Sequence, residues 1–139
     1  MPVTYLAALR TDRLRLVLNE LGTATAPTIS TTGTAAGSLV IGTSALSGAT
    51  GVLVTVPLPT TPASVTGDVL TLLGVPLSAT ASATGTAAKA ELRDNAGVAI
   101  VTGLTVTASG GGGDVIISSV AITSGQTVQV TSGTITHPA

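Results

Sequence analysis

From residue 37 onward, the chain consists of short runs of valine, leucine, isoleucine and threonine that glycine, proline, serine or asparagine interrupts. Several runs alternate apolar and polar residues with a period of two, which is typical of β-strands. We expect eight strands, over residues 38–42, 52–58, 68–73, 86–93, 98–102, 104–107, 115–122 and 127–136. This pattern predicts a mainly β fold, an antiparallel β-sandwich of immunoglobulin-like or jelly-roll type, and leaves the choice between those two topologies open.

The run 86–93 illustrates the pattern, with Ala88, Ala90 and Leu92 on one face and Lys89, Glu91 and Arg93 on the other. We interpret the charged face, together with Asp94, as solvated, with cross-strand ion pairs that contribute little. The alternative is an electrostatic contact patch for a neighbouring subunit. Residues 94–97 are turn-formers and predict a hairpin with the following strand, and residues 124–126 predict a second hairpin between Ile122 and Thr127.

The core must be packed almost wholly by aliphatic side chains, because the sequence has no Phe, no Trp and one Tyr. At 139 residues the chain is the size of one domain. A small aliphatic core leaves little net stability, and only 8% of the residues are charged. Both features favour self-association, since a soluble monomer normally carries more charge on its surface.

One N-terminal α-helix is predicted between Thr4 and Leu21. Thr4 or Thr11 can cap its start, and Gly22 suits the position after its end. Its apolar stripe, at helical spacing, is formed by Leu6, Leu14, Val17, Leu18 and Leu21.

The chain therefore divides into an attachment segment at 1–22, a Thr/Ala-rich linker at 23–36 and a β-sandwich domain at 37–139. We expect the five stripe residues to contact a partner, either another protein or the same helix in sister subunits. The alternative is that this helix folds back over one end of its own sheet.

The residues that usually carry catalysis or bind metals are scarce. Cysteine is absent, and the single histidine, His137, lies near the end of the chain. Asp68 and Asp114 are isolated carboxylates, far short of the six to eight oxygen ligands that calcium usually takes. The run Gly110–Gly113 lacks the Lys-Ser/Thr ending of a phosphate-binding loop, and we interpret it as a flexible loop. We expect no catalytic residue, no cofactor, no metal site and no enzymatic activity.

Composition also argues against two classes of partner. The net charge is −1 and no basic patch is visible, so we expect no nucleic-acid binding. No apolar run approaches the roughly 18 residues of a spanning helix, so we expect no membrane insertion. Charged residues at 10, 12, 13 and 15 interrupt the place where a secretory signal would have its apolar core. We expect a chain made in the cytoplasm.

Three segments carry a resemblance to a known family: YLAALRTDRL at 5–14, ATGTAAKAELRDNAG at 83–97 and ITSGQTVQVTSGTIT at 122–136. The chain resembles small structural proteins of tailed bacteriophages, and the stretch 23–36 resembles a variable insert. The resemblance implies a virion protein made in the host bacterium, and we expect a capsid decoration or cement protein on the head shell. It implies no catalytic residues.

The partners expected from this reading are the major capsid protein or other virion proteins, together with sister subunits in a homotrimer. One alternative is a protein of the tail, neck or fibre. A further alternative is a carbohydrate-binding β module, against which the scarcity of aromatic residues argues.

Overall fold

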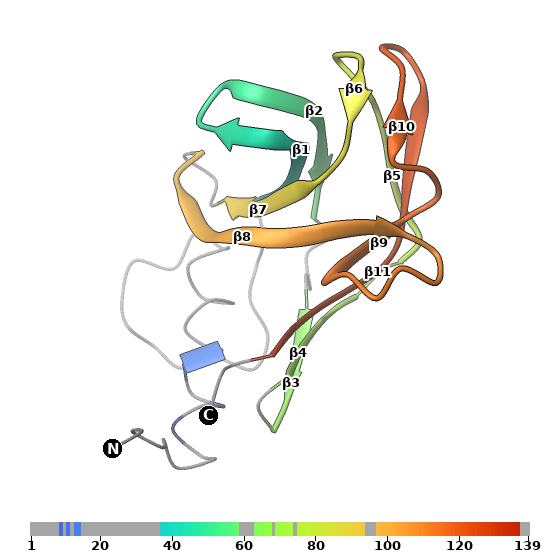
Figure 1. Ribbon diagram of the computed structural model, residues 1–139. Helices are drawn as coiled ribbons and strands as arrows, with labels where there is room; N and C mark the ends of the chain where they lie inside the picture. Colours follow the sequence, from blue (N-terminus) through green and yellow to red (C-terminus); the bar gives the residue numbers. More distant parts are fainter. Residues whose placement is uncertain are drawn as a thin grey trace, which may run out of the picture.

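The computed structural model describes residues 9, 11, 13, 14, 37–58, 63–67, 69–73, 75–93 and 97–136. Within these residues the protein is mainly β, as predicted (Figure 1). The strands are β1 Ser38–Ser47, β2 Thr50–Pro57, β3 Ala63–Thr66, β4 Val69–Leu72, β5 Leu77–Thr80, β6 Gly85–Thr86, β7 Lys89–Arg93, β8 Ala99–Ala108, β9 Val115–Ile117, β10 Ala121–Ile122 and β11 Thr127–Thr136.

Nine of these strands form one large sheet in the order β2-β1-β7-β8-β9-β11-β4-β3, with β5 also paired to β11. The strands β6 and β10 form a separate two-stranded sheet. The large sheet curls until β5 lies against β2, where the amide of Ser82 donates to the carbonyl of Leu53 at 2.8 Å (Figure 1). The division into two packed sheets, as in a sandwich, stays a prediction.

The expectation of a purely antiparallel sheet is wrong at one pair, because β8 and β9 run parallel. Parallel neighbours normally need a crossover of a dozen or more residues. Here residues 109–114 suffice, because β9 is short and only Val106–Ala108 lie beside it.

The glycine run explains this short connection. A Cβ on Gly111 would lie 2.5 Å from the Cβ of Thr107, and Gly110 and Gly112 have φ of 88° and 73°. The amide of Gly113 donates to Thr107 Oγ1 at 3.0 Å. The run interpreted as a flexible loop is therefore a hydrogen-bonded connection that turns the chain back along β8.

Several strand boundaries differ from the prediction, although β11 has the predicted bounds. The run 86–93 divides into β6 and β7, because the amides of Ala87 and Ala88 donate to Val120 and Gly42 instead. The run 115–122 likewise divides into β9 and β10. The two runs on either side of Gly103 are one strand, β8, in which that glycine has a φ of 75° at a register shift. The strands β3 and β5 were not predicted.

Of the two predicted hairpins, the one joining β7 to β8 is confirmed, with Lys89 opposite Thr105 and Arg93 opposite Ala99. The second is wrong in its pairing. A turn does lie at Ser124 and Gly125, but β10 pairs with β6, and the first half of β11 pairs with β5.

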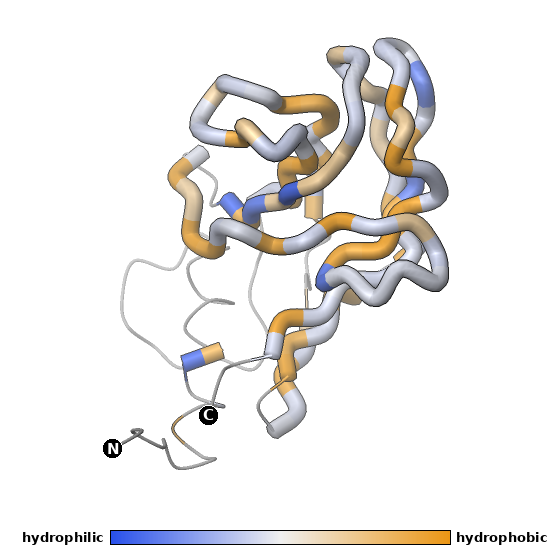
Figure 2. The backbone as a smooth tube through the Cα atoms, viewed as in Figure 1, coloured by the Kyte–Doolittle hydropathy of each residue, from blue (hydrophilic) through white to orange (hydrophobic). Residues whose placement is uncertain are grey.

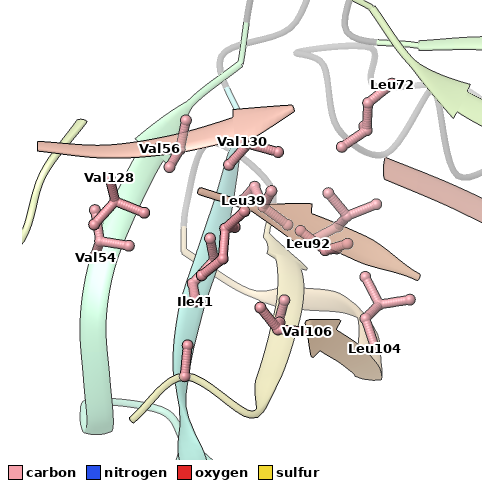
Figure 3. Close-up of a cluster of buried hydrophobic side chains, with 14 of the residues drawn as sticks. Leu39, Ile41, Val54, Val56, Leu72, Leu92, Leu104, Val106, Val128 and Val130 are labelled. Atoms are coloured by element: carbon pink, nitrogen blue, oxygen red, sulfur yellow. The ribbon is translucent and has the colours of Figure 1, made fainter. Parts of the chain in front are cut away.

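The core is aliphatic, as expected, and lies inside the curled sheet (Figure 3). Side chains from β1, β2, β4, β7, β8 and β11 point into it, and Figure 3 labels ten of them: Leu39, Ile41, Val54, Val56, Leu72, Leu92, Leu104, Val106, Val128 and Val130. We call the buried set to which they belong the main core.

The predicted N-terminal helix lies mostly outside the described residues. Leu9, Thr11, Arg13 and Leu14 are described and are helical in conformation, but they do not amount to a helix element. The continuous helix between Thr4 and Leu21 is therefore not seen.

Candidate functional site

The strongly hydrophilic positions of the described sheet gather on β7 and at a few other places, while most of the chain is pale or apolar (Figure 2). On β7 these positions are Lys89, Glu91 and Arg93, which lie on the face opposite to Ala90 and Leu92 of the main core. This outer face of β7 is the most chemically distinctive surface in the described part of the chain.

The interpretation of this face as a solvated strand surface is wrong at Glu91, whose residue is only 6% exposed. Arg93 Nε and Nη2 donate to Glu91 Oε2 at 3.1 and 2.9 Å, and the two side chains are 14% and 8% exposed, respectively. A buried ion pair is retained only where hydrogen bonds satisfy both partners. Lys89, by contrast, is exposed as predicted.

A second bond explains why this pair is buried. Arg93 Nη2 also donates to the backbone carbonyl of Gly48 at 2.7 Å. Gly48 lies at the tip of the β1–β2 hairpin, so the guanidinium joins β7 to a segment 45 residues earlier in the chain.

Two apolar side chains are buried beside this pair. Val40 lies opposite Glu91 in the β1–β7 register and is 1% exposed, and Leu46 is 9% exposed. Among the described residues, these two are the buried apolar side chains that do not belong to the main core. We call Val40, Leu46, Glu91, Arg93 and the carbonyl of Gly48 the outer cluster.

Sequence reasoning missed the contributions of Leu46 and Gly48. The signal was a single large apolar residue, Leu46, within the otherwise small and polar stretch 43–50, which Gly42 and Gly51 bound. A leucine in such a stretch needs a surface on which to pack, but the sequence does not say which one.

Asp114 is hydrogen-bonded to Thr105. Its Oδ2 accepts from the amide and the hydroxyl of Thr105, both at 3.0 Å, and its own amide donates to Thr105 Oγ1 at 3.0 Å. Together these bonds connect the start of β9 to β8. Asp114 therefore stabilises the connection between the parallel strands β8 and β9.

Of the five predicted partner-contact residues, only Leu14 is described. It is 3% exposed and belongs to the main core. The hydroxyl of Thr11, one turn earlier, donates to the carbonyl of Gly67 in the β3–β4 turn. At this position the structure favours the alternative, in which the segment packs on its own sheet. Leu6, Val17, Leu18 and Leu21 lie outside the described residues.

The outward positions of β5, β11 and β4 carry uncharged polar side chains. Cross-strand neighbours on this surface are Thr127 with Thr80, Gln129 with Ser78, and Thr134 with Thr71, and all six are exposed. We call these six residues the hydroxyl face. It spans three strands without a charge.

The described residues contain no group of three His, Cys, Asp or Glu side chains that could hold a metal ion. His137, Asp68 and Asp94 lie outside them. In the part of the chain that the structure describes, no helix has the length and apolar character needed to cross a membrane.

Comparison with known proteins gives no further assignment. No protein-family model, curated protein or solved structure matches the chain.

Proposed function

We propose that this protein is a structural component of the virion of a tailed bacteriophage, specifically a capsid decoration or cement protein bound on the head shell. The proposal rests on the resemblance of segments 5–14, 83–97 and 122–136 to small structural proteins of these phages. Its partners would be the major capsid protein and sister copies in a trimer.

The structural observation that best supports the proposal is the hydroxyl face. The centres of protein–protein interfaces are depleted of charged residues, because a buried charge loses its hydration. Pairs such as Thr127 with Thr80 can be covered by another subunit without that cost. Threonine and serine hydroxyls can still exchange hydrogen bonds with the covering surface.

The hydrogen bonds of three ionisable side chains, Glu91, Arg93 and Asp114, support the same class of function. Glu91 and Arg93 bond to each other and to the hairpin tip, and Asp114 bonds to Thr105. These groups stabilise the connections between strands, which is the role expected of them in a structural protein.

The proposal is tested by quantifying the chain in purified virions by mass spectrometry, relative to the major capsid protein. A decoration protein should be present in a constant ratio of the same order as the capsid protein, because it occupies a site repeated over the lattice. A few copies per particle would support the tail, neck or fibre alternative instead. Absence from washed virions would contradict any virion role.

A further inference from the structure

The β1–β2 hairpin is irregular beyond Ile41. Gly42 pairs with Val52, and the next pair is Ser47 with Thr50. Between these pairs β1 advances by five residues and β2 by two, so three residues of β1 have no counterpart. Such a large bulge changes the direction of both strands. Residues 43–50, which we call the tip segment, therefore lie beyond a break in the regular pairing of the two strands.

Two glycines lie where the hairpin changes direction. A Cβ on Gly42 would lie 2.4 Å from the carbonyl oxygen of Gly51, and a Cβ on Gly51 would lie 2.7 Å from Thr43 Oγ1. Gly51 also has a φ of 74°. The two strands can approach and bend at this point because neither residue has a side chain.

The bend directs the tip segment back over β7. Arg93 pairs with Ser38 at the start of β1, whereas it donates to Gly48, ten residues further along the chain. In a straight strand these positions would be about 33 Å apart, far beyond the reach of an arginine side chain. The bond from Arg93 is therefore possible only because the tip segment is folded over.

The two apolar members of the outer cluster lie where the folded tip meets β1: Val40 belongs to β1 beneath the tip, and Leu46 belongs to the tip segment itself. Val40 and Gly42 share the outer face of β1, opposite Glu91 and Lys89. Leu46 Cδ1 would be 2.7 Å from a Cβ on Gly42, so the leucine side chain lies directly on this face. Its position beside Val40 accounts for burial on a face that points away from the main core.

We propose that the tip segment is a flap, hinged at Gly42 and Gly51, which Arg93 holds closed over Val40. Opening breaks the bond from Arg93 to Gly48 and exposes Val40 and Leu46, while the main core stays intact. This device goes beyond the virion role and does not depend on it. It gives the protein an apolar surface, formed by Val40 and Leu46, that is available only in the open state.

The absence of cysteine from the sequence permits a direct test. A single thiol is introduced as Val40→Cys under the flap or, as a matched control, as Val54→Cys, which is 0% exposed in the main core. Each variant is combined with Arg93→Gln, and the rate of reaction with a thiol reagent is measured under native conditions. The flap predicts that Arg93→Gln raises the rate at position 40 by at least about tenfold more than the rate at position 54. Equal increases at both positions would indicate global unfolding, and no increase at position 40 would show that Arg93 does not hold the segment. Either result overturns the proposal.

Hydrogen exchange on the unmodified chain supplies a second test, independent of whether Arg93→Gln folds. Amides of residues 45–50 should exchange through local opening, at rates that low concentrations of denaturant hardly change. Amides of Leu39–Ile41 should exchange only through global unfolding, with a strong denaturant dependence. The same dependence in both groups would contradict a separate flap.

Discussion

Strand β1 is buried on both faces, and the two faces are stabilised in different ways. Leu39 and Ile41 point into the main core, where aliphatic side chains from several strands surround them (Figure 3). Val40, between them, points the other way and lies beside a buried ion pair. Leu39, Val40 and Ile41 are each 1% exposed or less. Equal burial therefore does not imply equal resistance to opening, because many apolar side chains cover one face, whereas Leu46 and the guanidinium of Arg93 cover the other.

The comparison is sharpened by removing the same side chain from each face. Leu92→Ala truncates a fully buried residue of the main core and should lower the free energy of unfolding by about 2–5 kcal/mol. Leu46→Ala truncates the outer cluster and should cost about 1–2 kcal/mol, because the tip segment can settle into the vacated space. Urea-induced unfolding measures both values. Equal losses would show that the two clusters form one cooperative unit.

The N-terminal segment extends the comparison, because Leu14 belongs to the main core. Leu14→Ala should lower the free energy of unfolding by about 2–4 kcal/mol, as expected for a leucine that is 3% exposed. Leu9→Ala is the matched control, since Leu9 is 43% exposed and should change stability little. An unchanged unfolding curve for Leu14→Ala would favour the attachment segment predicted from the sequence, with its stripe directed at a partner.

The smallest effect is expected at the parallel connection. Asp114→Ala removes the acceptor of the two bonds from Thr105 and should cost about 1 kcal/mol. Asp114→Asn retains an oxygen acceptor and should cost less. Added chelator should not change the melting temperature of the unmodified protein or of either variant, since Thr105 accounts for the bonds of this carboxylate. A chelator-dependent drop in the unmodified protein would reveal a metal site that this account does not contain.

Alternating runs predicted the presence of strands more reliably than their bounds. The strand β11 has the predicted bounds because polar residues alternate with valine or isoleucine over much of its length. The strands β3 and β5, Ala-Ser-Val-Thr and Leu-Ser-Ala-Thr, are four residues each and too short to show a clear period. Gly103 was read as a break between strands, although a glycine with positive φ also suits a bulge within one strand.

The local pattern could not predict either of the two non-local features. The parallel pairing of β8 with β9 depends on a glycine connection packed around Thr107, and a sequence pattern does not distinguish it from a hairpin. The alternation on β7 placed Glu91 and Arg93 on the correct face. Their burial depends on the distant Gly48, so the sequence predicted the face of these two residues but neither their pairing within one strand nor their burial.

The central claim, a decoration protein on a phage head, is tested most directly by electron cryomicroscopy of intact virions. We expect density that fits the curled nine-stranded sheet of this chain at positions repeated over the outer surface of the head, clustered in threes. The hydroxyl face should lie against the shell or a sister copy. Density for the chain that is confined to the tail or neck would contradict the claim. So would a head surface on which other proteins account for all of the density.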